Sequence, residues 1–265
     1  MALCVVVLAP QKKSTMRIEW HIDSDDVRRV KAFFEAHKNA AFVKRRIQKN
    51  VKRKNIRVSR TDFWQTMVSC LLTTQQRSGP NTPVTRFIRT KPFPLSYSRC
   101  CSQRNVRQFV ETQLGRFGGL WRWKEIANEL TTNLSLLEDG LWSEVLPLSN
   151  QLRSARNAKA ERRAAEFIDN SFKGFGPKQS RNLLQILGLT RYEIPIDSRI
   201  TKWLNSFGFP VRLSAQALAD RNYYNFVSDG FQTLCKRSRV YPCELDAAIF
   251  VSFDKEEWRE DEIVW

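Results

Sequence analysis

The chain has 265 residues, of which 42% are hydrophobic, so it is long enough and apolar enough to fold around a core. Its 44 Lys and Arg residues outnumber its 27 Asp and Glu residues, and the net charge of +17 favours a polyanionic partner over an acidic membrane surface. The sequence has no stretch of about 18 apolar residues, which excludes an ordinary membrane-spanning helix.

Residues 1–15 are expected to form a disordered extension. Ala2–Pro10 is apolar but short, and it lacks the basic segment that opens a signal peptide. Met16 opens a more typical start of a folded chain. Soon after it, Asp23 or Ser24 is predicted to cap a first helix.

Residues 41–60 contain nine Lys or Arg residues and no acidic residue. We interpret this segment as an arm that contacts phosphates, with a solvated flexible face as the alternative. A helix is predicted next, from its N-cap Asp62 to Leu72, with Gln65 completing a capping box. It leads into the polar run at 73–76.

The middle of the chain is predicted to be a loop followed by helices. Residues 78–99 are rich in Pro, Ser and Thr, which is typical of a connecting loop. Helical periodicity returns from Val106 to Leu148. Within that range, Trp121 and Trp123 are expected to lie in the core beside leucines. Strand alternation is not sustained anywhere, so the predicted fold class is all-α.

A tight turn between two helices is predicted near residue 174. Apolar residues recur every fourth position up to Phe172, as on one face of a helix. Gly174 and Gly176 end that helix and are expected to allow positive φ in a short turn. Pro177 suits the first position of the next helix, which is expected to end at Gly188. The pattern therefore predicts a helical hairpin.

Such a hairpin can bind a phosphate and activate a lysine. Bare amides and the positive end of the second helix attract anions. Lys178 lies one residue inside that end, where the helix dipole and nearby cations should lower the pKa of its ammonium group. A lysine that loses its proton is a candidate nucleophile for Schiff-base chemistry. Asp197 is the predicted N-cap of the following helix, and its carboxylate can turn toward the start of the lysine's helix.

The residues at 174–178 and 194–197, Gly-Phe-Gly-Pro-Lys and Ile-Pro-Ile-Asp, carry a resemblance to a known family. They are similar to the signature of the helix-hairpin-helix DNA glycosylase superfamily, and most closely to its bifunctional 8-oxoguanine glycosylase/lyase branches. In bifunctional members a lysine follows the hairpin and an aspartate follows at this spacing, which corresponds to Lys178 and Asp197. Relatives that only hydrolyse the glycosidic bond usually lack the lysine.

The resemblance covers roughly Met16 to Phe250 and implies two all-helical lobes with an active-site cleft between them. Residues 16–76 and 196–265 would form one lobe. Residues 77–195 would form the central lobe, which ends in the helix-hairpin-helix. Lys178 and Asp197 would then meet at the cleft.

The resemblance also implies roles for residues outside the catalytic pair. The residues expected to bind the DNA backbone are Lys173, Gly174, Phe175 and Gly176. One of Gln75 and Gln76 is the candidate to fill the gap left by an extruded base, although a polar helix end bonded to solvent is the alternative. The candidates for the base pocket are Trp203, Phe231 and Gln232. Asp246, in contrast, is expected to be a helix cap or a surface carboxylate.

The function that the resemblance implies is that of a bifunctional DNA glycosylase and abasic-site lyase. It would flip a damaged base, with 8-oxoguanine favoured, out of duplex DNA and excise it through a lysine Schiff base. It would then nick the strand by β-elimination. The alternatives are a glycosylase for another oxidised or alkylated base and a non-catalytic helix-hairpin-helix DNA-binding protein. We expect a cytoplasmic monomer, nucleoid-associated in a prokaryote, whose partner is double-stranded DNA with a damaged base and not a membrane.

No organic cofactor and no metal site is expected. The six cysteines show no C-x-x-C pair and no zinc spacing with the two histidines, so we interpret them as reduced thiols. Cys235 and Cys243 cannot supply the four-cysteine iron–sulfur loop that some relatives carry near the C-terminus. The resemblance implies that the hairpin carbonyls can hold a monovalent cation.

Overall fold

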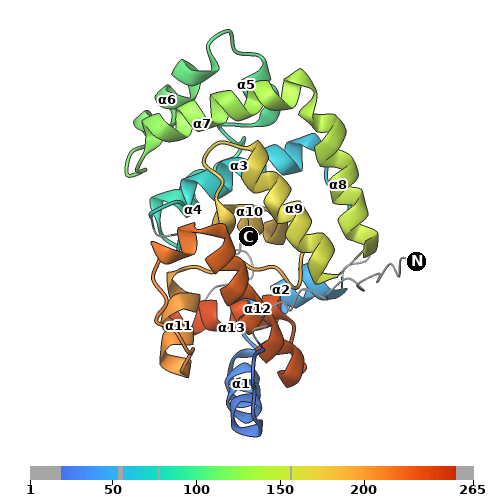
Figure 1. Cartoon of the computed structure of the whole chain (residues 1–265). Helices are drawn as coiled ribbons and strands as arrows, with labels where there is room; N and C mark the ends of the chain where they lie inside the picture. The colour runs from blue at the N-terminus through green and yellow to red at the C-terminus, as the bar shows by residue number, and fades with distance from the viewer. Residues whose placement is uncertain (1–18, 53–55, 77, 156, 255–265) are drawn as a thin grey trace, which may run out of the picture.

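The computed structural model describes residues 19–52, 56–76, 78–155 and 157–254. These residues form helices and connecting loops and contain no strand, which confirms the predicted all-α fold (Figure 1). The extension expected at 1–15 lies outside the described residues. No helix within the described ranges is long and apolar enough to cross a membrane.

The N-terminal helices are α1 (Ser24–His37), α2 (Ala41–Arg46), the π-helix η1 (Ile47–Lys52) and α3 (Arg60–Leu72). The central helices are α4 (Pro83–Arg89), α5 (Tyr97–Cys101), α6 (Val106–Phe117), α7 (Trp123–Leu136), the π-helix η2 (Leu137–Leu141), α8 (Trp142–Ala155), α9 (Ala158–Ser171) and α10 (Pro177–Ile186). The C-terminal helices are α11 (Ser198–Phe207), the 3₁₀ turn η3 (Ala217–Ala219), α12 (Arg221–Ser238) and α13 (Pro242–Phe253).

Side-chain caps fix the first two long helices. Asp23 caps α1 and shares a capping box with Asp26, as one of the two predicted caps. The predicted cap of α3 was wrong, because Ser59 rather than Asp62 is its N-cap. The Ser59 hydroxyl accepts the Asp62 amide at 3.1 Å, and the Asp62 carboxylate accepts the Ser59 amide at 3.1 Å. Asp62 therefore fills the acidic third position of the box, and Gln65 takes no part in it.

The segment at 78–99 is not only a loop, as the sequence predicted, because it contains α4 and the start of α5. Thr82 caps α4 by accepting the Thr85 amide, and Pro83 occupies the first helical position. A proline there starts a helix without losing a backbone hydrogen bond. Pro83, one of the prolines that suggested a loop, is thus the first residue of a short helix.

Buried apolar side chains form two clusters. The first joins α3 to the central helices, with Trp64, Met67 and Leu71 fully buried in α3. The second joins α1 to the C-terminal helices, in the lower half of Figure 1. The structure thus places α3 with the central helices, although the boundary at residue 76 groups it with α1.

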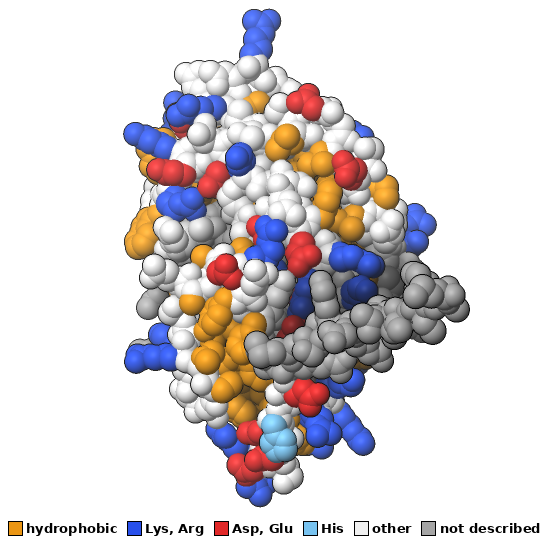
Figure 2. Space-filling model, viewed as in Figure 1, with side chains coloured by type: hydrophobic (Ala, Val, Ile, Leu, Met, Phe, Trp, Pro, Cys, Tyr) orange, Lys and Arg blue, Asp and Glu red, His pale blue; other side chains and the backbone are white. Residues whose placement is uncertain are grey.

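The two clusters meet at α10, α11 and α13. Leu183 of α10 belongs to the first cluster and Ile200 of α11 to the second. α13 contributes Ala247 to the first cluster and Ile249 to the second. Figure 2 shows Lys and Arg side chains spread over both lobes of the face in view, with acidic side chains among them. The candidate catalytic residues lie on the helices where the two apolar clusters meet.

Candidate active site

The turn between α9 and α10 is built around Gly174. Its φ is 79°, and a Cβ there would lie 2.6 Å from Cδ2 of Leu71 and 2.7 Å from Cδ of Glu129. Only glycine fits this close approach of the hairpin to α3 and α7. The prediction of positive φ was wrong for Gly176, which has φ −109°, and a Cβ added there would meet no atom within 4 Å. Gly176 thus leaves open space at the N-terminus of α10.

Asn133 of α7 holds the first residue of the hairpin. Its side chain donates to the Lys173 carbonyl at 2.9 Å and accepts the Lys173 amide at 2.8 Å, and it is fully buried. The Lys173 side chain is exposed and free to meet a phosphate. The Phe175 side chain is buried against Phe172, so only its backbone can take the DNA-contacting role predicted for it.

Lys178 is the second residue of α10, as predicted, and its side chain is partly buried. Within the described residues it makes no hydrogen bond and no ion pair. Burial lowers the pKa of its ammonium group, and the positive charge of Arg199 lowers it further, while Asp197, Cys70 and Asp246 act in the opposite direction. The direction agrees with the prediction, but desolvation is the main cause rather than the helix dipole.

Asp197 is the N-cap of α11, as predicted. Its Oδ1 accepts the amides of Arg199 at 2.8 Å and Ile200 at 3.1 Å, and its Oδ2 lies 3.5 Å from Nη1 of Arg199. These contacts fix the carboxylate close enough to act electrostatically on Lys178. Lys178 near the start of α10 and Asp197 at the start of α11 therefore lie within electrostatic reach of each other.

Arg199 connects this pair to α13, a role that the sequence did not reveal. Its guanidinium lies 4.0 Å from the centre of the Phe250 ring and 3.3 Å from Oδ1 of Asp254. The Phe250 ring in turn stacks on Phe42 at 4.5 Å. The sequence signal for this role was a basic residue two positions after Asp197. The residues that Arg199 contacts are about 50 positions further along the chain, so sequence reasoning could not identify them.

Asp246 is neither a helix cap nor a surface carboxylate, contrary to prediction. It is 7% exposed and lies in the first half of α13. Its Oδ2 accepts Nε2 of Gln185, a buried residue of α10, at 3.0 Å. Burial raises the pKa of Asp246 to about 6, partly offset by Arg46. A second carboxylate therefore stands within electrostatic reach of Lys178.

The structure distinguishes the two candidate glutamines at the end of α3. Gln76 donates to the Leu72 carbonyl and accepts the Trp121 amide at 3.1 Å, which holds its side chain in place. Gln75 is exposed, with φ 62° in the left-handed region. Gln75 is thus the one of the two glutamines whose side chain is exposed to solvent at this turn.

Trp121 is exposed, so the prediction that it lies in the core was wrong. It is 64% exposed, whereas Trp123 is partly buried. α7 begins only at Trp123, after its N-cap Arg122 with φ 54° in the left-handed region, so Trp121 stands before the helix and off its apolar face. The hydrogen bond to Gln76 places Trp121 beside the Gln75 turn. Gly118 and Gly119 mark the end of α6, but no capping side chain at Arg122 signals where α7 begins.

Two of the predicted base-pocket residues, Trp203 and Phe231, lie in the second apolar cluster. Phe231 is fully buried there, and Trp203 packs on Phe207 at 4.8 Å and on Phe33 at 5.5 Å. Gln232 donates to the buried carboxylate of Glu193 at 2.8 Å. The base-pocket role of these three residues stays a prediction.

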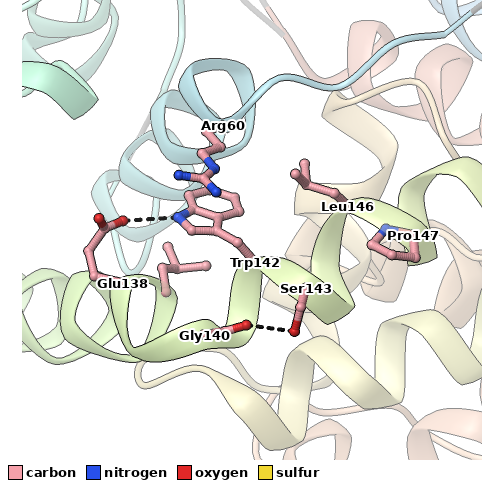
Figure 3. A pocket seen from close by; sticks show the side chains of 8 residues that line it. Arg60, Glu138, Gly140, Trp142, Ser143, Leu146 and Pro147 are labelled. Atoms are coloured by element: carbon pink, nitrogen blue, oxygen red, sulfur yellow. Dashed lines mark hydrogen bonds between the residues drawn. The ribbon is translucent and has the colours of Figure 1, made fainter.

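An open pocket of about 520 Å³ lies elsewhere, between the start of α3 and the start of α8 (Figure 3). Figure 3 shows Arg60 beside the ring of Trp142, whose Nε1 donates to Glu138 at 3.0 Å. Arg60 is the first residue of α3, and Leu71, which lies against the hairpin, is 11 residues later in the same helix, so the pocket is about 16 Å from the hairpin along the helix. This pocket is not lined by Lys178 or Asp197.

The described residues offer no cluster of side chains for a metal ion at this junction. Among them, no group of three or more His, Cys, Asp or Glu side chains could hold one. Burial raises the pKa of the Cys70 thiol to about 12. The monovalent cation at the hairpin stays a prediction, and the Lys173 carbonyl already accepts a hydrogen bond from Asn133.

Solved structures of an archaeal enzyme share this architecture. The 8-oxoguanine DNA glycosylase of Methanocaldococcus jannaschii superposes with a TM-score of 0.64 at 17% sequence identity, over 89% of this chain and 98% of the enzyme. The chain has the same overall fold as this enzyme. The glycosylase/lyase from the same organism in complex with a 15mer DNA containing 8-oxoguanine gives the same score and identity, over 87% and 100% of the two chains. No model of a protein family matches the sequence, and no curated protein matches it significantly. In this glycosylase fold, Lys178 and Asp197 occupy the junction between the lobes.

Proposed function

We propose that the chain is a DNA glycosylase with lyase activity, in which Lys178 is the nucleophile. The observation that carries the proposal is the environment of Lys178. Lys178 stands at the start of the second hairpin helix, partly buried and with no hydrogen bond or ion pair to the described residues, and the fixed carboxylate of Asp197 acts on it electrostatically. A solvated phosphate-binding lysine would need neither the desolvation nor the carboxylate. A lysine nucleophile needs its neutral form, which desolvation favours.

The chemistry follows from the position of the pair. The target base must leave the stack before its sugar can be reached. The hairpin amides bind the backbone beside it, which positions the sugar without identifying the base. The neutral Lys178 amine attacks C1′, so that the Nζ–C1′ bond forms and the glycosidic bond breaks, and the electron pair of the glycosidic bond leaves with the base. Asp197 stabilises the positive charge that develops on the sugar. The C1′–O4′ bond then breaks, O4′ takes up a proton and the nitrogen loses one, which gives an open-chain imine. Removal of a C2′ proton from this imine expels the 3′ phosphate by β-elimination.

Gln75 and Trp121 form the proposed edge that enters the DNA. Gln75 stands out from its turn, and Trp121 presents an exposed ring beside it. The end of α3 and the middle of α7 connect this edge to the hairpin, because Leu71 and Glu129 both lie against Gly174. A glutamine can bond the base left without a partner, and a tryptophan can stack on a neighbouring base. Base extrusion and backbone binding would thus use one continuous face.

The proposed lesion is 8-oxoguanine. Support comes from the shared fold with an archaeal enzyme that has been solved with DNA containing this base. Another oxidised or alkylated base is the alternative lesion, and it would use the same lysine.

Borohydride trapping tests the proposal. The protein is incubated with labelled duplexes that contain 8-oxoguanine opposite cytosine, an abasic site, or no lesion, and the imine is reduced to a stable covalent adduct. We expect an adduct with the 8-oxoguanine and abasic duplexes that disappears in Lys178→Gln, while DNA affinity changes little.

Two other outcomes are informative. An adduct with the abasic duplex alone would retain the lysine chemistry and reject 8-oxoguanine as the lesion. Binding without any adduct, or full strand cleavage by Lys178→Gln, would contradict the proposed enzyme.

A further inference from the structure

The start of α10 and the end of α3 are joined by hydrogen bonds from one buried side chain, that of Gln179. Gln179 follows Lys178 directly in the chain and is 5% exposed. Its Nε2 donates to the Cys70 carbonyl at 2.9 Å and to Oγ1 of Thr74 at 2.7 Å. The residue next to the proposed nucleophile therefore bonds to the residue next to Gln75.

Asn182 fixes the orientation of the Gln179 amide. It lies one turn further along α10, and its Nδ2 donates to Oε1 of Gln179 at 3.2 Å and to Sγ of Cys70 at 3.6 Å. The nitrogen of the Gln179 amide is thus bonded to α3 and the turn that follows it, and the oxygen is bonded to α10. A buried amide with partners for both its nitrogen and its oxygen keeps one orientation. The amide therefore fixes the position of Thr74 relative to α10.

The turn after α3 depends on contacts of this kind. Gln75 has φ 62°, and a residue other than glycine keeps such a left-handed conformation only where the surrounding structure holds it. On one side of Gln75, Thr74 accepts the hydrogen bond from Gln179. On the other side, Gln76 accepts the Trp121 amide at 3.1 Å. The exposed Gln75 side chain thus stands between two residues that are each bonded to another part of the fold.

Filling the gap in the duplex and attacking the sugar concern the same nucleotide. Its base has to leave the stack before Lys178 can reach C1′, and Gln75 is the residue proposed to fill the space that the base leaves. The amine and the glutamine must therefore be held at a constant separation, since a misplacement of about 1 Å can cost about 10²-fold in rate. Gln179 adjoins the lysine in the chain and bonds to the neighbour of the glutamine.

We propose that Gln179 is a positioning residue that fixes Gln75 relative to Lys178, so that the base that leaves the stack is the one whose sugar meets the amine. This inference rests on the proposed glycosylase and lyase function and adds a residue for the extrusion step. Gln179 acts through Thr74 and not on the base or the sugar. Loss of its contact should therefore slow base removal but spare the lysine chemistry at a site that has already lost its base.

The test compares two single-turnover reactions of each protein. One is excision of 8-oxoguanine opposite cytosine, which requires extrusion of a base, and the other is cleavage of an abasic duplex, which does not. Thr74→Val removes the hydroxyl that accepts the bond from Gln179 and keeps the shape of the side chain. We expect excision to slow by about 10–10²-fold, with cleavage of the abasic duplex close to the wild-type rate.

Thr73→Val is the matched control in the same turn. The Thr73 hydroxyl donates to the Cys70 carbonyl at 2.8 Å and, within the described part of the chain, has no hydrogen bond to α10. This variant should excise 8-oxoguanine as the wild type does. Gln179→Met, which removes both bonds to the end of α3 with a side chain of similar size, should show the same selective loss and decides the question if Thr74→Val does not fold. Thermal unfolding shows which proteins are folded.

A double variant tests whether the contact acts through Gln75. Gln75→Ala should itself slow excision, because it removes the side chain that fills the gap. Adding Thr74→Val to Gln75→Ala should then slow excision little further, because the bond has no glutamine left to position. A double variant whose loss equals the product of the two single losses would show that Thr74 acts on another group, and it would overturn the inference.

The failures can be told apart. A wild type that forms no Lys178-dependent adduct overturns the proposed enzyme and this inference together. Where the wild type forms that adduct, equal losses on both duplexes in Thr74→Val and Gln179→Met overturn the inference alone, because Gln179 would then only support α10. Wild-type excision by Thr74→Val or by Gln75→Ala, or a similar loss in Thr73→Val, also overturns it alone. A wild type that cleaves the abasic duplex and leaves 8-oxoguanine in place keeps the lysine chemistry and counts against an extrusion step for this lesion.

Discussion

At the scale of single residues, Asp197 combines a structural and a chemical task. Its carboxylate caps α11 through two backbone amides, and its charge acts on Lys178. The two tasks can be separated because asparagine caps a helix about as well as aspartate but carries no charge. Substitution by asparagine therefore removes the charge and leaves the helix start in place.

We predict that Asp197→Asn slows base removal by about 10²–10⁴-fold with little change in stability. Single-turnover excision measures the first effect, and thermal unfolding measures the second. The matched control is Ser59→Asn, which also places asparagine at a helix N-cap, at the start of α3. It should leave both quantities nearly unchanged. Normal excision by Asp197→Asn would reduce Asp197 to a cap.

The positions of the proposed catalytic pair were predictable from the sequence because its two residues belong to a local pattern. Pro177 and Asp197 each start a helix through rules that need only neighbouring residues, and these starts fix where Lys178 and the carboxylate lie. Asp246 was not predictable in the same way. Its burial depends on Gln185 and Arg46, which are distant in the chain and met only in the folded structure.

At the scale of elements, the hairpin depends on two glycines for different reasons. Gly174 has positive φ and lies against side chains of α3 and α7. Gly176 has ordinary φ and open space in front of it. One glycine therefore serves the packing of the hairpin, and the other leaves room for a ligand at the N-terminus of α10.

We predict opposite effects for the two alanine variants. Gly174→Ala should cost about 2 kcal/mol or more in stability, because it combines a left-handed alanine with overpacking against Leu71 and Glu129. For a chain of this length, that lowers Tm by roughly 5 °C or more. Gly176→Ala should unfold at the wild-type temperature and weaken DNA binding, because its methyl group occupies the open space. Thermal unfolding and DNA titration of the same pair of proteins measure both effects. A stable Gly174→Ala variant, or a Gly176→Ala variant with wild-type affinity, would contradict this division.

Element boundaries were predictable where a cap or a proline marks them, and less so where tertiary contacts decide. The sequence indicated the hairpin, and the structure contains it at 172–177. It did not reveal α4, because Pro83 can start a helix or interrupt one, and only Thr82 before it distinguishes the two. Trp121 was misplaced for a related reason. The apolar spacing includes Trp121 and Trp123, but α7 begins only at Trp123, and no capping side chain at Arg122 marks that start.

At the scale of the whole molecule, the excess of 17 positive charges should dominate DNA binding. Most of these charges contact no base, so they supply affinity without sequence preference. Each neutralised phosphate contributes about −0.9 to the slope of log K against log salt concentration. Stacking by an aromatic ring releases no counterions. The salt dependence therefore separates the charged part of the binding face from the edge at Trp121.

We predict a steep salt slope for the wild type on an undamaged duplex, with an affinity that falls by at least about 10³-fold between 50 and 200 mM salt. Lys173→Gln should make the slope shallower by about 0.9, because we expect the exposed Lys173 side chain to contact one phosphate at the hairpin. Trp121→Ala should weaken binding to an abasic duplex by about 1–3 kcal/mol with the slope unchanged, because it removes stacking alone.

Two substitutions outside the proposed DNA-binding face serve as controls for Lys173→Gln and Trp121→Ala. Lys236→Gln removes an exposed charge on α12, remote from the hairpin in sequence, and Val211→Ala trims an exposed apolar side chain before η3. If the DNA lies along the hairpin and the Gln75 turn, both should bind as the wild type does. Equal slopes for Lys173→Gln and Lys236→Gln would mean that the charge acts as a diffuse field and not through the hairpin. Wild-type affinity in Trp121→Ala would remove the α3–α7 edge from the DNA interface and leave backbone binding to the hairpin alone.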